Sequence, residues 1–112
     1  MNLIVFPAPD LEKSKTLFRA LLGTDPYVDE PYYVGFRTGA IEIGLDPRGK
    51  SAGPIAYWDV EDIDGTLQRL IEAGAEKVQD PRDVGGGLLI AQARDTGGST
   101  IGLRTGALAQ RR

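Results

Sequence analysis

The sequence predicts an α+β fold built from two βαβββ modules, because the same order of elements occurs twice along the chain. In each half an apolar strand-like run leads into a helical pattern and then into three further short strands. The two helix starts match, since Asp10-Leu11-Glu12 corresponds to Asp62-Ile63-Asp64. The last strands match as well, since Ile43-Gly44-Leu45 returns as Ile101-Gly102-Leu103. One such module would leave a side of its sheet uncovered, so we expect the pair to form the folding domain.

Composition bounds both the domain count and the classes of partner. A chain of 112 residues fits one compact domain, with modules at about 1–48 and 53–106 and a tail at 107–112. The net charge of -3 lacks the basic excess of a nucleic-acid binder, and no apolar run approaches the ~20 residues of a membrane span. The chain has no cysteine and no histidine, which excludes disulfides, thiolate sites and the commonest metal ligand. We therefore expect a cytoplasmic protein with neither a nucleic-acid nor a membrane partner.

The first module is predicted from an apolar run followed by an amphipathic helix. The run from Asn2 to Phe6 has the length of a buried strand. Asp10 is a candidate N-cap, and Gly23 stands at the usual helix stop. The apolar residues predicted to share one face of this helix are Leu11, Leu17, Phe18, Leu21 and Leu22. The three strands expected after it lie near 27–28, 32–36 and 41–45.

The second module repeats this pattern from residue 54 onward. A strand is expected over 54–60, and a helix begins after the candidate N-cap Asp62 and ends near Gly74. Its apolar positions follow the i, i+4, i+7, i+8 spacing of one helix face, at Ile63, Leu67, Leu70 and Ile71. Three strands are expected near 77–78, 88–93 and 100–103. The glycine run 85–87 precedes an apolar segment and not a helix, so a loop is favoured over a phosphate-binding site.

Three segments in this order resemble the vicinal-oxygen-chelate superfamily, which includes glyoxalases, bleomycin resistance proteins and extradiol dioxygenases. The segment 10–23 is similar to the first strand-to-helix signature of that family, and Val60-Glu61-Asp62-Ile63-Asp64 is similar to the second. The segment 95–103 resembles its closing turn and last strand. The resemblance covers nearly the whole chain and implies curled mixed sheets with the helices on the outer face.

The resemblance also implies where a metal would be held in active relatives. These carry a histidine or similar ligand on the first strand and a glutamate on the last strand of each half. By register, the four positions fall on Leu3, Gly44, Ile55 and Gly102 in this chain. None of these side chains can bind a metal, so we expect no metal, no cofactor, and no metal-dependent glyoxalase or dioxygenase activity. The glycines at 44 and 102 are expected to leave volume where a metal would sit.

Relatives bind ligands on the concave side of the sheets, and strand alternation then predicts which side chains face it. If Leu3 and Ile55 point inward, Ile4, Phe6 and Trp58 point toward the helices. The predicted ligand-binding residues are Tyr57, Asp59, Glu42, Arg104, Thr100, Tyr33 and Val5, with Phe36 as an alternative to Tyr33 and Gln92 as a further contributor. An apolar floor with few polar anchors suits a small organic ligand.

Simpler interpretations of the same residues stay open at this point. Trp58 is expected to be an ordinary core residue. Asp59, near a strand end, is as consistent with a solvated rim charge as with a ligand anchor. Glu42 and Arg104 could form a structural ion pair or contact a ligand, and neither alternative is favoured by the sequence.

Three functions are compatible with these residues. The first is a protein that binds a small organic molecule without metal, as bleomycin-resistance-type relatives do. The second is a metal-independent isomerase or lyase that uses Glu42 or Asp59 as general base, with Arg104 or Tyr57 stabilising an oxyanion. The third is a homodimeric interaction module. We expect a homodimer in each case, because the resemblance implies it.

Overall fold

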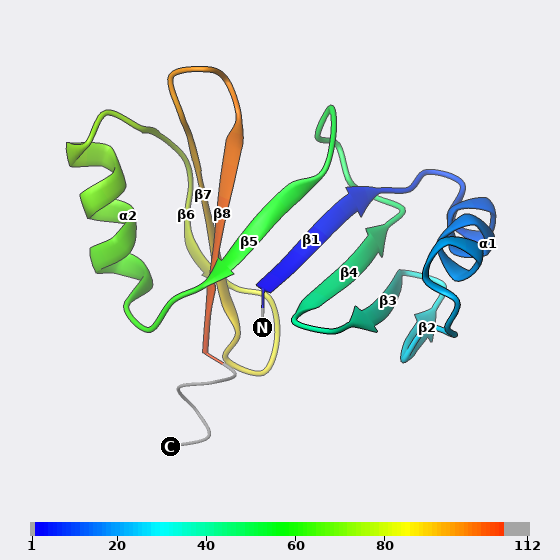
Figure 1. The fold of residues 1–112 in the computed structure, drawn as a ribbon. Coiled ribbons are helices and arrows are strands. Elements are labelled where there is room, and N and C mark those ends of the chain that lie inside the picture. The colour runs from blue at the N-terminus through cyan, green and yellow to red at the C-terminus, as the bar shows by residue number, and fades with distance from the viewer. Residues whose placement is uncertain (1, 107–112) are drawn as a thin grey trace. The chain divides into compact units, whose positions relative to one another are not determined.

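A computed structural model describes residues 2–106 of the chain as two compact units, the second of which begins at Ala56 (Figure 1). Each unit contains one helix and four strands, which confirms the predicted α+β class and the βαβββ order of both modules. The predicted tail at 107–112 lies outside the described residues. Neither of the two helices within 2–106 is long and apolar enough to cross a membrane.

The first unit is a mixed sheet in the order β2-β3-β4-β1. Strands β1 and β4 run parallel, and the other neighbours run antiparallel. A parallel pair needs a crossover, and here the crossover carries α1. The elements are β1 (Asn2–Pro7), α1 (Leu11–Leu22), β2 (Val28–Glu30), β3 (Tyr33–Thr38) and β4 (Ile41–Asp46).

Helix α1 begins and ends where the sequence predicts. The carboxylate of Asp10 accepts a hydrogen bond of 3.2 Å from the Lys13 amide, which satisfies one of the free N–H groups of the first turn. Gly23 closes the helix in the left-handed region at φ 69°, where a side chain would be strained. The prediction of a single apolar face is wrong in part, because Leu17 and Leu21 are 63% and 74% exposed.

The core of the first unit lies between α1 and one face of its sheet. Phe36 is fully buried, and the ring of Phe18 from α1 lies 5.0 Å from the ring of Phe6 and 6.3 Å from that of Phe36, measured between centroids. Ile4 packs against the same cluster, as predicted from strand alternation. Phe36 therefore belongs to the core and not to the ligand face, which rules it out as the alternative to Tyr33.

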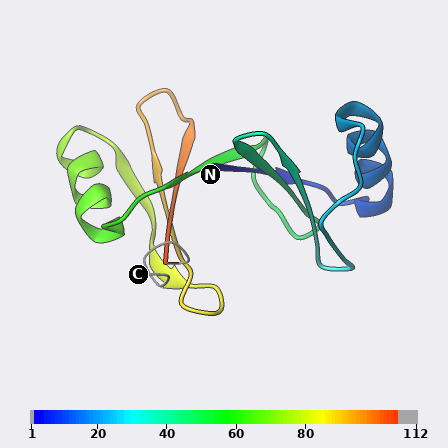
Figure 2. The ribbon, with the colours of Figure 1, turned by 60° about the horizontal axis from the view of Figure 1, so that its bottom comes forward.

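The second unit repeats the arrangement in the order β5-β8-β7-β6. Strands β5 and β8 run parallel, and β8, β7 and β6 are joined by antiparallel pairs. The yellow loop in Figure 2 joins β6 to β7 and contains the glycine run, as expected for a loop. The elements are β5 (Ile55–Asp59), α2 (Ile63–Glu72), β6 (Glu76–Asp83), β7 (Leu89–Arg94) and β8 (Thr100–Thr105).

Helix α2 covers one face of this sheet and is capped by Asp62, whose side chain accepts a 3.0 Å hydrogen bond from the Gly65 amide. Ile63 and Leu67 are buried against Leu103 and two fully buried alanines of β7. The contacts of α2 are with β6, β7 and β8. The core is thus made by the predicted helix stripe on small strand residues.

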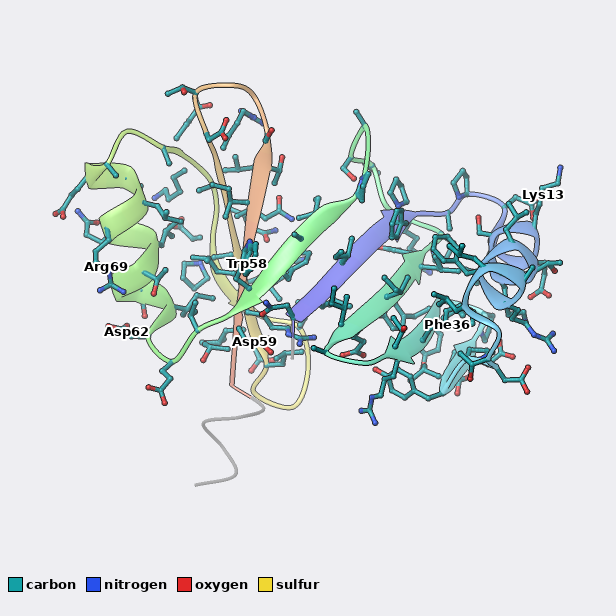
Figure 3. All side chains as sticks on the ribbon, in the orientation of Figure 1. Lys13, Phe36, Trp58, Asp59, Asp62 and Arg69 are labelled. Carbon is teal, nitrogen blue, oxygen red and sulfur yellow. The ribbon has the colours of Figure 1, made fainter. Side chains whose placement is uncertain are left out.

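Two predictions for this unit are corrected. Trp58, which is labelled on β5 in Figure 3, was expected in the core, but it is 51% exposed. Its register partner Leu103 lies in the core, so Trp58 is on the helix side of a strand that α2 does not cover. The strand expected at 77–78 extends over Glu76–Asp83 and includes Pro81. Proline is tolerated there because β6 has a strand on only one side within this unit.

Candidate functional site

The face of the second sheet that points away from α2 carries an organised set of polar side chains. Alternation along β8 separates the core residue Leu103 from Gly102 and Arg104, which lie on the open face. Cross-strand register brings Tyr57 and Gln92 to either side of Gly102, and Asp59 beside Arg104. This face therefore holds four of the predicted ligand-binding residues, Tyr57, Asp59, Thr100 and Arg104, together with Gln92.

Tyr57 lies across the backbone of β8. A Cβ atom added at Gly102 would come within 2.5 to 2.8 Å of three atoms of the Tyr57 ring, so the ring rests directly on the glycine. The hydroxyl of Tyr57 accepts a 2.7 Å hydrogen bond from Nε2 of Gln92, two strands away from β5. The side chain is only 7% exposed, and contacts at both of its ends fix the position of its hydroxyl group.

Asp59 and Arg104 form the second polar contact of this face. Nε of Arg104 donates a 2.7 Å hydrogen bond to Oδ1 of Asp59, and these side chains are 15% and 26% exposed. Partial burial acts to raise the pKa of the Asp59 carboxyl, but hydrogen bonds and opposite charge, including those of Arg104, lower it below its ordinary value of 3.8. Asp59 is thus charged at neutral pH and paired with Arg104, and its role as a ligand anchor stays a prediction.

The open face of the first unit has a different character. Leu3 and Val5 of β1 are in register with Glu42 and Gly44 of β4, on the side opposite the core residues Ile4 and Ile43. The Tyr33 hydroxyl and ring lie over Gly44, with the ring carbon Cζ 2.9 Å from a Cβ placed there. The predicted residues Val5, Tyr33 and Glu42 thus share this face.

An aromatic and cationic pair extends the same face and was not predicted. The ring of Tyr27 lies 3.2 Å from a Cβ placed at Gly35, and the guanidinium carbon of Arg37 lies 4.1 Å from the Tyr27 ring centroid. Such stacking holds a guanidinium in place while leaving its edge open to solvent. Nothing in the sequence pattern around Arg37 indicated the stack.

The volume expected at the two glycines is filled. At both Gly44 and Gly102 a tyrosine ring occupies the space into which a side chain would grow. The expectation of an open space at these positions is therefore wrong. The reason is that each glycine lies next to a strand whose tyrosine can lie flat across it.

The residues at the positions of the family's metal ligands do not fit a metal ion. Leu3, Gly44, Ile55 and Gly102 offer no side-chain donor, and Tyr33 and Tyr57 fill the space at the glycines. Within residues 2–106 no three or more aspartates or glutamates come together in a way that could hold a metal.

The predicted contact between Glu42 and Arg104 would join the two units and stays a prediction.

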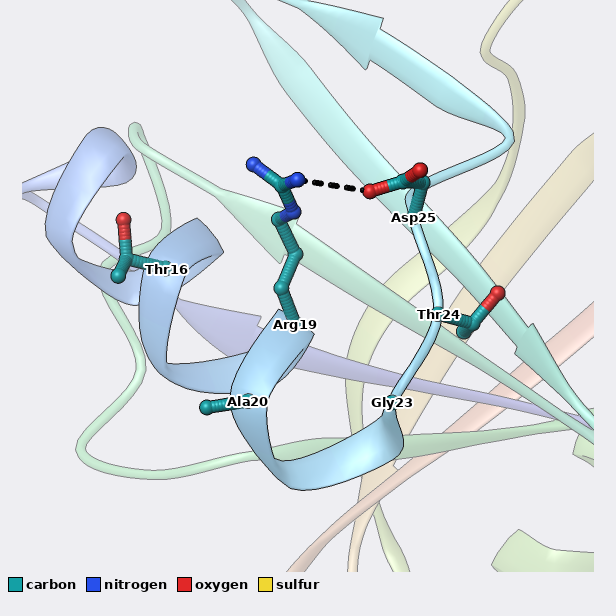
Figure 4. A pocket seen from close by; sticks show the side chains of 6 residues that line it. All are labelled: Thr16, Arg19, Ala20, Gly23, Thr24 and Asp25. Carbon is teal, nitrogen blue, oxygen red and sulfur yellow. Dashed lines mark ion pairs between the residues drawn. The ribbon is translucent and has the colours of Figure 1, made fainter.

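A hollow of about 380 Å³ lies elsewhere, at the C-terminal end of α1 (Figure 4). Thr16, Arg19, Thr24 and Asp25 line it, and Arg19 forms a 2.8 Å ion pair with Asp25 across it. Both charged side chains are more than half exposed, so the pair contributes little stability. No predicted ligand-binding residue lines this hollow, and we do not assign a site to it.

Comparison with known proteins identifies the family. The model of the glyoxalase/bleomycin resistance protein/dioxygenase superfamily matches residues 1–103. No curated protein matches the sequence. Among solved structures, an NAD-dependent benzaldehyde dehydrogenase from Legionella pneumophila is similar with a TM-score of 0.78 and 18% identity, over 95% of this chain and 99% of that one.

Two further solved structures show the same fold. A glyoxalase/bleomycin resistance protein/dioxygenase superfamily member from Vibrio splendidus 12B01 has a TM-score of 0.72 at 16% identity, over 94% of this chain and 97% of that one. Methylmalonyl-CoA epimerase from Mycobacterium tuberculosis has a TM-score of 0.61 at 18% identity, over 95% and 85%. Identities this low establish the fold and not an activity. The chain belongs to the glyoxalase/bleomycin resistance protein/dioxygenase superfamily.

Proposed function

We propose that this protein acts in the cytoplasm and binds a small organic molecule on the open face of its second unit, without a metal. The observation that carries the proposal is the pair of contacts on that face, from Gln92 to Tyr57 and from Arg104 to Asp59, both 2.7 Å long. Polar groups held in fixed positions by such hydrogen bonds can orient a ligand without losing side-chain entropy at binding.

Binding is favoured over base catalysis by the state of Asp59. A general base works best when its pKa lies near the operating pH. The pKa of Asp59 is instead lowered, and its carboxylate is already hydrogen-bonded to Arg104. Asp59 is therefore a poor proton acceptor near neutral pH, and this half of the isomerase or lyase hypothesis loses support. Glu42 stays a candidate base, with no feature of its surroundings that favours it.

The test is a binding screen with chelator-treated protein. Thermal shift against a panel of small aromatic antibiotics and metabolites, followed by calorimetry, is expected to give ligands that bind in the presence of EDTA. The variant Tyr57→Phe keeps the ring over Gly102 but removes the hydroxyl, so affinity is expected to fall by roughly 3- to 10-fold, the effect of one hydrogen bond. The matched control is Tyr32→Phe at a tyrosine that is 62% exposed, where affinity is expected to be unchanged. If no compound of a broad panel binds, the proposal is contradicted.

A homodimer is a second proposal and has separate support. Leu17, Leu21 and Trp58 expose large apolar side chains, and association of two chains would cover such surface. Sedimentation equilibrium is expected to give twice the 12.0 kDa mass of the chain. A monomer at all accessible concentrations excludes both this proposal and the homodimeric interaction module.

A further inference from the structure

We infer that the open face of the second unit recognises a neutral carboxamide or urea group through Tyr57, Gln92 and Gln79. The inference rests on the proposed function, since it names the chemistry of the ligand bound at that face. Gln79 was not predicted from sequence, because it lies in a stretch of β6 whose polar residues gave no strand pattern.

The direction of the hydrogen bond between Gln92 and Tyr57 determines which groups are left for a ligand. Because Nε2 of Gln92 donates to the tyrosine oxygen, the bond uses neither the hydroxyl proton of Tyr57 nor the amide oxygen of Gln92, which leaves one donor and one acceptor on hydrogen-bonded neighbours. Neither side chain makes a second hydrogen bond with the residues that the structure describes. A donor and an acceptor fixed next to each other match a group that presents C=O and N–H together, as an amide does.

An unpaired acceptor, Oε1 of Gln79, lies in the same cross-strand row. Gln79 of β6 is in register with Gln92 of β7, which is in register with Gly102 beneath Tyr57. Oε1 of Gln79 is buried and has no hydrogen-bond partner within residues 2–106. A buried acceptor left unpaired is unfavourable, so a ligand N–H that reaches it would recover that free energy.

The backbone around Gln79 is irregular in a way that explains its inward position. The pairing of β6 with β7 shifts register both before and after Gln79. Gln79 is partly buried, while Lys77, Val78 and Asp80 beside it are exposed. Bulges commonly turn a side chain toward a functional site. The irregular pairing thus places the neutral side chain of Gln79 on the open face, while its neighbours in β6 stay exposed to solvent.

The polar groups of this face distinguish an amide ligand from a carboxylate. Asp59 and Arg104 lie in the next row of this face and form an ion pair, with 2.7 Å between Oδ1 and Nε. Arg82, in register with Ile90 and through it with Arg104, is an exposed cation of that row. In the row of Tyr57, by contrast, the amide oxygens of Gln92 and Gln79 would repel a carboxylate, which favours a neutral ligand there. A carboxylate would also offer no N–H to Gln79.

The experiment uses the full chain, treated with chelator, and three probes that share a phenyl ring and a carbonyl group. These are benzamide, N,N-dimethylbenzamide and sodium benzoate, each titrated by NMR. Benzamide is expected to bind at least about 10-fold more tightly than the other two, since they lack the N–H donors. The amide signals of β6, β7 and β8 are expected to shift with it.

Variants then assign the preference to Gln79. Gln79→Leu is expected to lower the affinity for benzamide by roughly 5- to 10-fold and to leave that for N,N-dimethylbenzamide unchanged. Tyr57→Phe, which removes the hydroxyl group, gives a second measurement of how strongly benzamide is preferred over N,N-dimethylbenzamide. The matched control is Gln68→Leu on α2, where the glutamine binds Glu72 at the surface, and both probes are expected to bind as to the native chain.

Each outcome separates the inference from the proposed function. Equal binding of benzamide and its dimethyl derivative, or a preference that survives Gln79→Leu, overturns the amide inference while leaving small-molecule binding intact. No binding of benzamide, with other ligands found on the same face, also overturns the inference alone. Absence of any ligand in the wider screen removes both.

Discussion

The two units share one βαβββ plan but differ in what fills their cores and open faces. The first unit packs the rings of Phe6, Phe18 and Phe36 beneath α1, whereas the second packs Ile63 and Leu67 on alanines of β7. On the open faces, the first unit stacks Arg37 on Tyr27, and the second holds a hydrogen-bonded polar row. The shared pattern fixes strand order and helix position, while the side chains have given each half a different chemistry.

The largest predicted effect distinguishes the two cores. Phe36→Ala in the first unit is expected to lower the free energy of unfolding by roughly 3–5 kcal/mol, because the ring is fully buried and its removal leaves a cavity. Leu103→Ala in the second is expected to lower it by roughly 2–4 kcal/mol. Denaturant unfolding followed by circular dichroism measures both. A milder effect for Phe36→Ala than for Leu103→Ala contradicts the difference between the cores.

The two glycines beneath tyrosine rings offer a sharper comparison. Gly102→Ala is expected to lower the free energy of unfolding by about 1–3 kcal/mol, because the new Cβ meets the base of the buried Tyr57 ring. Gly44→Ala meets the hydroxyl group of Tyr33, which is the far end of that side chain and not the base of the ring, so a smaller loss is expected. Unfolding of the second unit can be followed by the fluorescence of Trp58, the only tryptophan in the chain. Equal losses at both positions refute the proposed contact at Gly102.

The Asp59–Arg104 pair makes the stability of the second unit depend on pH. Asp59→Asn removes the carboxylate that accepts from Nε of the largely buried Arg104, and is expected to lower the free energy of unfolding by about 1–3 kcal/mol at pH 7. Because the pKa of Asp59 is lowered in the folded protein, the contribution of the pair is present above 3.8 and is lost as the pH falls through the folded value. The difference between native and variant protein should therefore shrink in acid. A difference that is independent of pH down to 2 excludes this origin.

The smallest effect is expected at Trp58. With half of its surface exposed on the uncovered side of β5, Trp58→Ser should change the stability of the monomer by less than about 1 kcal/mol. Thermal unfolding at low protein concentration measures this. A loss as large as that for Leu103→Ala would restore the original assignment of Trp58 to the core.

Periodicity and end signals predicted most of the fold. Asp10, Gly23 and Asp62 mark helix ends through local backbone chemistry, so their positions follow from sequence alone. Trp58 could not be placed in the same way, because its exposure depends on which strands α2 covers. The full length of β6 was missed, because a strand with one neighbour and two register shifts carries polar residues and a proline.

The sequence predicted which side chains share the open face of the second unit, but not how they contact one another. Alternation from the core placed Tyr57, Asp59, Thr100 and Arg104 on one face, as the structure confirms. The filling of the glycine positions was missed, since whether a tyrosine lies flat over a glycine depends on cross-strand register. Gln79 was missed for the same reason: only the bulges that flank it turn it inward.

The central claim is metal-independent binding of a small molecule on the open face of the second unit. The most direct test is an NMR titration of uniformly labelled, chelator-treated protein with the best ligand from the screen. The account predicts saturable shifts in EDTA that cluster at Tyr57, Gln92 and Arg104. Binding that vanishes in EDTA and returns with added metal, or shifts confined to the hollow beside α1, would contradict it.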